Sequence, residues 1–229
     1  MKTLQRPGTL ASATNGMKRR QFLGYVAATA SAATIISACH KDDGGSGNGG
    51  IDLGSGDIGI LNYAYALEQL EAAFYTQVIA SPYVNITADE TALLTDIRDH
   101  EIVHREFFKT ALGTSAIPAL EVNFSAIDFT SRDSVLGTAK AFEDLGVSAY
   151  NGAGQLITDV SYLLVAGKIV SVEARHAAYI RDLISYGSFA DDSIINANGL
   201  DLIATPTAVL ATASAFLKSK LDGSHLPTN

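Results

Sequence analysis

The stretch EIVH at residues 101–104 returns as EARH at residues 173–176, and these two tetrapeptides decide the fold. In each, a glutamate precedes a histidine by three positions. That spacing puts both side chains on one face of an α-helix, close enough to bind one ion. Apolar residues flank both stretches at intervals of three and four, which is typical of a helix with one face in a core. The sequence therefore predicts two helices that each present a carboxylate and an imidazole to the core.

The repeat extends upstream of both tetrapeptides. Each is preceded by a helical segment that has a glutamate in its apolar stripe and a tyrosine seven residues later. These pairs are Glu68 with Tyr75, and Glu143 with Tyr150. Two interpretations of the tyrosines stay open: they hydrogen-bond the site or carry electrons, or they are packed core residues.

Two polar residues beside the stripes have no counterpart in the repeat. Glu71 falls opposite Gly146 when the halves are aligned. This favours Glu68 as the site carboxylate and leaves Glu71 as its neighbour or as a surface residue. His100 adjoins Glu101 but points about 100° away around the helix. We therefore expect His100 at the surface or behind the ligands.

Capping and helix-breaking residues indicate four long helical segments and a short fifth one after Asp57. TADE at residues 87–90 is a capping box that opens the second of them. The expected segments are 57–82, 87–113, 131–154, 159–186 and 206–218. Short links make the first two segments, and the next two, antiparallel hairpins. Residues 113–130 are long enough to run back along a helix of about 30 Å, since extended chain covers about 3.3 Å per residue. We predict an all-α four-helix bundle of two hairpins with a long crossover, plus a short C-terminal helix.

Four stripe carboxylates, one per long helix, are expected to converge. An unpaired buried carboxylate costs several kcal/mol, and neighbouring carboxylates repel one another. No Lys or Arg in the stripes faces these positions, which leaves metal ions as the positive charge. The candidate metal ligands are Glu68, Glu101, His104, Glu143, Glu173 and His176.

This ligand set resembles the di-iron carboxylate proteins, which include ferritins, bacterioferritin and rubrerythrin. LEQLEAAFY at residues 67–75 and VEARHAAY at residues 172–179 look like the exported ferritin-like domain family that includes desiccation-related proteins. The resemblance implies a ferritin-like bundle with two metal ions, iron or alternatively manganese. It also implies that Glu101 and Glu173 bridge the ions. The remaining ligands would complete one shell each: Glu68 with His104, and Glu143 with His176.

The first 56 residues resemble an export signal followed by a tether. KRRQFLG at residues 18–24 opens an alanine-rich apolar stretch that resembles a twin-arginine export signal, with Met1 or Met17 as the start. The stretch ends in ISAC at residues 36–39, which looks like a lipobox that directs acylation of Cys39. The alternative is a buried free thiol. A Gly/Ser-rich run at 44–50 is typical of a flexible tether. We expect a signal segment at 1–38, an acylated tether at 39–56 and the bundle at 57–222.

Charge and anchor define the expected partners. The first 38 residues hold five of the 16 basic residues and none of the 24 acidic ones, so 11 basic residues remain beyond them. Nucleic acid requires clustered Lys and Arg and is not an expected partner. We expect the lipid bilayer, reached through Cys39, as a partner. His40 in place of Asp resembles lipoproteins sorted to an outer membrane, with surface exposure and a homo-oligomer left open.

Two functions of different classes fit these features. The first is an oxidoreductase that oxidises Fe(II) or consumes peroxide or dioxygen at an envelope-anchored di-metal centre. The second is a non-catalytic, stress- or desiccation-related envelope scaffold. A manganese catalase is a third possibility. In that family the fourth helix supplies a histidine without the matching Glu-x-x-His, so Glu173 argues against it. A storage cage is disfavoured by the tether, the crossover and the extra helix.

Overall fold

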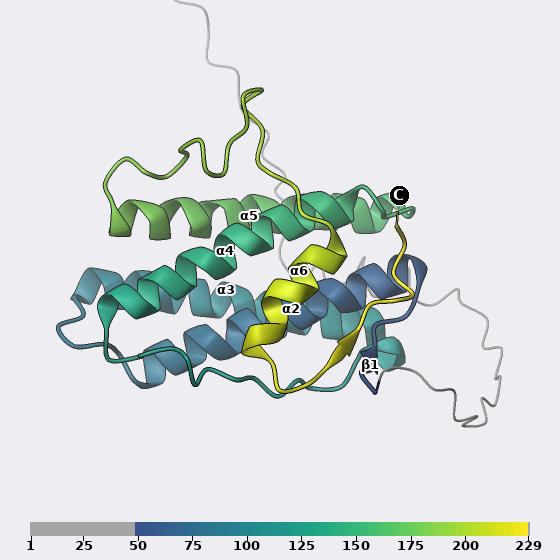
Figure 1. The fold of residues 1–229 in the computed structure, drawn as a ribbon, viewed down its shortest axis with the longest axis horizontal. Helices are drawn as coiled ribbons and strands as arrows, with labels where there is room; N and C mark the ends of the chain where they lie inside the picture. Colours follow the sequence, from purple (N-terminus) through teal and green to yellow (C-terminus); the bar gives the residue numbers. More distant parts are fainter. Residues whose placement is uncertain (1–48, 229) are drawn as a thin grey trace, which may run out of the picture. The chain divides into compact units, whose positions relative to one another are not determined.

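Four long helices form the body of the protein in the computed structural model, which describes residues 49–228. They are α2 (Gly56–Ala80), α3 (Ala88–Leu112), α4 (Arg132–Gly154) and α5 (Val160–Ile184). Figure 1 shows α2 pairing with α3 and α4 pairing with α5 as two antiparallel hairpins. The predicted bundle with its crossover and short C-terminal helix is confirmed. The proposed signal segment, Cys39 and most of the tether lie outside the described residues.

Local sequence explains where the helices begin. Thr87 Oγ1 accepts a hydrogen bond from the backbone N–H of Glu90 at 3.1 Å, while Glu90 Oε2 accepts one from the Thr87 N–H at 3.1 Å. This is the predicted capping box at the start of α3. Ser131 and Asp159 cap α4 and α5 in the same manner, each accepting from a backbone N–H of the first turn. Gly113, with φ of +54°, ends α3 where predicted.

The crossover and the C-terminal segment are joined to each other along the outside of the bundle. The crossover starts with a 3₁₀ turn, η2 (Gly113–Ser115), and runs back to the start of α4. Val122 forms an antiparallel bridge with Leu217, and the N–H of Asn123 donates to the carbonyl of Phe216 at 2.7 Å. The C-terminal segment therefore holds the crossover at residues 121–123.

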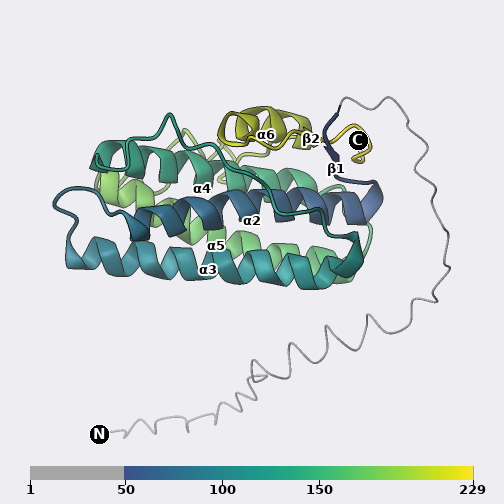
Figure 2. The same ribbon diagram turned by 90° about the horizontal axis from the view of Figure 1, so that it is seen from below.

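The short C-terminal helix α6 (Pro206–Ala213) lies against α4, as Figure 2 shows. It ends before the predicted limit near Lys218. A 3₁₀ turn, η3 (Ser214–Phe216), follows, and the chain then turns to pair with the crossover. Similarly, α5 stops at Ile184, two residues before the expected Tyr186.

Two short parallel strands join the first and last parts of the body. They are β1 (Ile51–Asp52) and β2 (Leu221–Asp222), with Ile51 opposite Leu221. The N–H of Ile51 donates to the carbonyl of Lys220 at 2.8 Å, and that of Leu53 to the carbonyl of Asp222 at 3.0 Å. The pair places residue 51 beside residue 221 at one end of the bundle.

A buried amide ties the crossover to this end. The side-chain N–H₂ of Asn62 on α2 donates to the carbonyls of Leu53 and Ser115, at 3.1 and 2.9 Å. Its Oδ1 accepts from the N–H of Ile117 at 3.0 Å. One side chain thus satisfies three backbone groups that would otherwise be left unpaired in the interior. Among residues 49–228, no helix combines the length and the apolarity needed to cross a membrane.

Candidate metal centre

All six predicted ligands lie together in the middle of the bundle. The four glutamate side chains have no exposed surface, His176 is 5% exposed, and the side chain of His104 is 12% exposed. Each long helix contributes one glutamate, and α3 and α5 each add a histidine one turn later. The spacing of three residues on a helix therefore delivers the side chains to one spot, as the sequence predicted.

The ligand atoms fall into two groups that share two members. In the first group, atoms that can bind a metal lie within 4.8 Å of one another; its members are Glu68, Glu101, His104 and Glu173. The second group meets the same limit and consists of Glu101, Glu143, Glu173 and His176. Glu101 and Glu173 are common to both. Each group could hold a metal ion, and these two carboxylates are within reach of either position.

The two histidines face the carboxylates through the same ring atom. His104 Nδ1 lies 2.9 Å from Glu173 Oε1 and 3.4 Å from Glu68 Oε2. His176 Nδ1 lies 2.9 Å from Glu101 Oε1 and 3.4 Å from Glu143 Oε2. Each imidazole therefore contacts a shared carboxylate and the unshared carboxylate of its own group.

The polar atoms that face the middle of the site lack hydrogen-bond partners among the described residues. They are Oε2 of Glu68 and Glu143, both oxygens of Glu101 and Glu173, and Nδ1 of His104 and His176. The 2.9 Å contacts are short enough for hydrogen bonds but do not have hydrogen-bond direction. Buried polar atoms are rarely left unpaired, because the loss of hydration is costly. Lone pairs that converge in this way fit metal ions, and the donor set of carboxylate oxygen and imidazole nitrogen suits iron or manganese.

Two tyrosines hold the unshared carboxylates from behind. The hydroxyl of Tyr75, on α2, donates to Glu143 Oε1 on α4 at 2.5 Å. The hydroxyl of Tyr150, on α4, donates to Glu68 Oε1 on α2. Each hydrogen bond crosses from one hairpin to the other and occupies one carboxylate oxygen, which leaves Oε2 facing the site. Both interpretations of these tyrosines therefore hold in part: they hydrogen-bond the site, and they are also packed in the buried core.

The electrostatics of the glutamates reflect their burial and their neighbours. Burial raises the pKa of Glu68 to about 7, against the opposing effect of His104. Burial and the charges of Glu101 and Glu68 raise the pKa of Glu173 well above its usual range. Burial also acts to raise the pKa of Glu101, but the imidazoles of His104 and His176 outweigh it and bring the pKa to about 2. The carboxylates thus cannot all be charged without added positive charge.

The histidines respond in the opposite sense. Burial lowers the pKa of His176, but the carboxylates of Glu101 and Glu143 outweigh it and raise the pKa to about 10. The pKa of His104 is also raised, because Glu101, Glu173 and Glu68 outweigh its burial. Without metal, protons on the imidazoles supply the positive charge. Metal binding requires neutral imidazole and releases those protons.

His100 is exposed at the surface, and its ring contacts the predicted ligand His176. Both positions predicted for it, at the surface and behind the ligands, are therefore correct. Its Nδ1 lies 2.9 Å from His176 Nε2, and the two rings stack at a centroid distance of 5.1 Å and an angle of 8°. Since His176 uses Nδ1 toward the site, His100 contacts the opposite ring nitrogen. Partners on that nitrogen commonly fix the orientation of a ligating histidine.

Glu71 lies in the core, so its interpretation as a surface residue is wrong and its interpretation as a neighbour of Glu68 holds. Only 4% of its surface is exposed. Its spacing from Glu68 and Tyr75, three residues after one and four before the other, placed it on the same helix face. This spacing alone would have predicted that Glu71 lies near the site. Its alignment with Gly146 argued against that prediction.

A four-helix bundle of two hairpins with a Glu/His group in its core defines the class of ferritin-like domains. The sequence of residues 56–186 matches the ferritin-like domain family, and this match covers more than half of the chain. The protein belongs to that family. Its buried Glu/His group is placed to hold metal ions. No curated protein matches the sequence.

Proposed function

We propose that this protein is an oxidoreductase whose core binds two redox-active metal ions, iron or alternatively manganese. Fe(II) oxidation, or the consumption of peroxide or dioxygen, is the proposed reaction. One observation carries the proposal. Two groups of buried ligand atoms share Glu101 and Glu173, and the atoms that face the site lack other partners.

The surroundings of the site support redox chemistry. Bound ions would supply the change of oxidation state. The chain's own residues fix where the ions can lie, because Tyr75 and Tyr150 each hold one carboxylate oxygen away from the site. The four carboxylates have no exposed surface, which excludes bulk water and strengthens electrostatic interactions at the site. The partial exposure of His104 supports the approach of a small oxidant from its side of the site.

Metal content of the purified full chain tests the proposal first. Mass spectrometry after anaerobic loading with Fe(II) or Mn(II) should give about two ions per chain. A double variant, His104→Ala with His176→Ala, should lose them. His225→Ala is the matched control, since that histidine is exposed and pairs with Asp52 away from the site. Loaded protein should then consume peroxide or dioxygen.

No metal in the loaded wild-type chain would overturn the proposal. The alternative, a non-catalytic stress- or desiccation-related scaffold, would then take its place. A scaffold needs the fold alone, so the thermal stability of the wild-type chain should be the same with and without added Fe(II) or Mn(II).

We also propose that the protein is exported and held at the cell envelope by acylated Cys39, with the outer membrane as its site. The support is the sequence alone: the lipobox-like ISAC and the Gly/Ser-rich stretch that follows. Cys39→Ser should move the protein from the membrane fraction to the soluble fraction after cell fractionation. Retention in the membrane fraction would contradict the anchor.

A further inference from the structure

Glu71 is a fifth buried carboxylate beside the six-ligand site. It lies on α2 one turn after Glu68, and 4% of its surface is exposed. Among the described residues it forms no hydrogen bond or ion pair. It belongs to neither ligand group. An ionised carboxylate is costly in the interior unless positive charge lies close to it.

The helix opposite makes room for this carboxylate. A Cβ atom at Gly146 of α4 would come 3.2 Å from Glu71 Oε1 and 3.7 Å from Glu173 Oε2. The oxygens of Glu71 and of the shared ligand Glu173 therefore both border the space that the glycine leaves. In the second half of the repeat, Gly146 itself stands where Glu71 stands in the first. The fifth carboxylate thus has no symmetric partner.

Burial and neighbouring charge make the position of Glu71 sensitive to the charge of the site. Burial is the main influence that raises the pKa of Glu71, and the charges of Glu101, Glu173, Glu143 and Glu68 add to it. Coulomb energies are larger in such surroundings than in water. A change of one unit charge at the metal centre therefore changes the electrostatic energy of Glu71.

Charge counting gives this carboxylate a role. Two divalent ions carry four positive charges, which match the four ligand carboxylates when both imidazoles are neutral. Oxidation of one ion from the divalent to the trivalent state sends one electron to the oxidant, peroxide or dioxygen, and leaves a fifth positive charge. Glu71 is the fifth carboxylate.

We propose that Glu71 stabilises the oxidised form of the metal centre and so lowers its reduction potential. The inference rests on the proposed function, since it assumes two redox-active ions. Glu71 is a positioning residue in this account, because it belongs to neither ligand group and acts on the ions through its own charge.

A redox titration of the loaded full chain tests the inference. Glu71→Gln keeps the size of the side chain and removes its charge. The variant should bind the same number of ions, but its midpoint potential should be higher. We expect the ratio of oxidised to reduced centre, at a fixed potential, to fall by about tenfold, which corresponds to about 59 mV for a one-electron couple. Electron paramagnetic resonance of the mixed-valence centre follows the titration without an activity assay.

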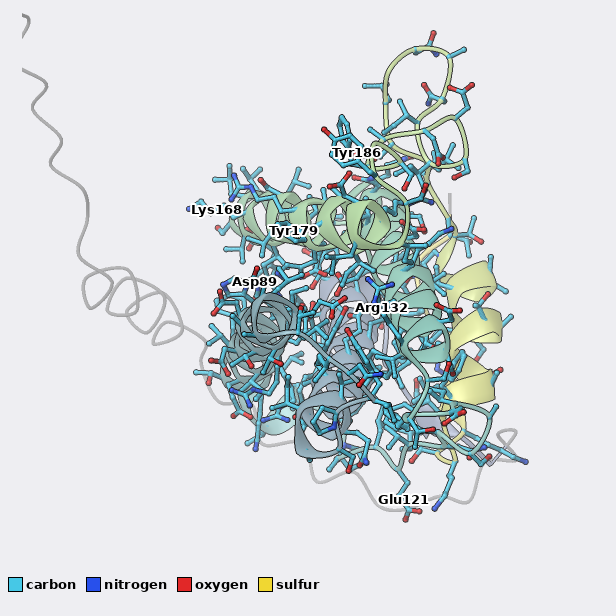
Figure 3. All side chains as sticks on the ribbon, turned by 90° about the vertical axis from the view of Figure 1, so that its left-hand side faces the viewer. Asp89, Glu121, Arg132, Lys168, Tyr179 and Tyr186 are labelled. Atoms are coloured by element: carbon cyan, nitrogen blue, oxygen red, sulfur yellow. The ribbon has the colours of Figure 1, made fainter. Side chains whose placement is uncertain are left out.

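Two further variants control the measurement. Glu121→Gln makes the same substitution on the crossover, where Figure 3 shows the side chain pointing into solvent, and should leave the potential unchanged. Gly146→Ala keeps all charges, but its Cβ must displace the Glu71 carboxylate by a few tenths of an ångström. It should shift the potential less than Glu71→Gln does. Alanine favours a helix more than glycine does, so this variant remains informative if Glu71→Gln does not fold.

The outcomes separate the inference from the function on which it rests. A normal metal content with an unchanged potential in both Glu71→Gln and Gly146→Ala would overturn the role of Glu71 and leave the proposed function standing. Loss of an ion from the Glu71→Gln variant would show that Glu71 is itself a metal ligand. That result would also overturn the inference. A wild-type chain that takes up no metal would overturn both.

Discussion

The long helices supply equivalent groups to the centre, yet α2 and α5 are embedded very differently. In α2, 17 of 25 residues are buried, whereas in α5 only six of 25 are. Both helices nevertheless place a glutamate in the core with no exposed surface. The comparison teaches that ligand placement follows from spacing along each helix. How deeply a helix is covered depends on segments outside the repeat.

Those covering segments explain the difference. The crossover and the C-terminal segment pack over the side of the bundle that α2 and α4 form (Figure 2). The outer face of α5 has no such cover among the described residues. It exposes Val160, Leu164 and Tyr179, and Figure 3 shows Tyr179 and Lys168 on this outer side. The apolar composition of α2 is therefore a consequence of coverage on all sides.

The largest effect should come from the carboxylates that the two halves share. Glu101→Ala and Glu173→Ala should each abolish binding of both ions, because each residue belongs to both ligand groups. Metal content by mass spectrometry measures this. If either variant kept two ions, its bridging role would be wrong, and the equivalence of the halves would be broken at the centre itself.

The difference in coverage should appear in stability. Leu70 on α2 is 2% exposed, whereas Leu164 on α5 is 62% exposed. Leu70→Ala should lower the free energy of unfolding by about 2–5 kcal/mol through lost burial and a cavity. Leu164→Ala should change it by less than about 0.5 kcal/mol. Urea unfolding of the metal-free protein gives both values, and similar losses would show that the outer face of α5 is covered in solution.

The two crossed tyrosine hydrogen bonds should matter about equally. Tyr75→Phe and Tyr150→Phe each remove one hydroxyl and free one carboxylate oxygen, on Glu143 and on Glu68 respectively. Loss of such a partner typically weakens metal affinity by about 10–100-fold. Competition with a chelator measures the affinity. A large effect in only one variant would show that the two ions are held by unequal means.

The smallest effect should come from the residue that the halves do not share. His100→Ala should weaken only the ion beside His176, by about tenfold, because the ring loses the partner of its Nε2. Val172 occupies the corresponding position before Glu173. Val172→Ala is therefore the matched control and should leave both affinities unchanged. Equal weakening of both ions in His100→Ala would argue against a role confined to one side.

The parts of the fold that could be predicted from the sequence are those that depend on local sequence patterns. The capping box at Thr87, the glycine at 113 and the spacing of Glu101 and His104 each act within a few residues, and the structure follows them. The convergence of the six predicted side chains could be predicted for the same reason. Its members lie in stripes whose direction is fixed by the helix period.

What sequence could not predict depends on how separate helices pack. The contact between His100 and His176 requires α3 and α5 to lie at one particular rotation. The burial of Glu71 depends on the space at Gly146 of the opposite helix. The bridge between Val122 and Leu217 joins segments with no local signal for each other. Each is a relation between distant segments, which helix periodicity does not encode.

The strand pair β1–β2 has a consequence for the order of folding. Each helical hairpin joins neighbouring segments, whereas β1 meets β2 only when residue 51 reaches residue 221. Closing a longer loop costs more chain entropy, and contacts distant in sequence form more slowly than local ones. We therefore expect the strand pair to close last, after the helices have docked. Residues 221–222, which follow the bundle along the chain, would then complete the attachment of β1, so a chain truncated before Leu221 would leave residues 51–53 without this partner.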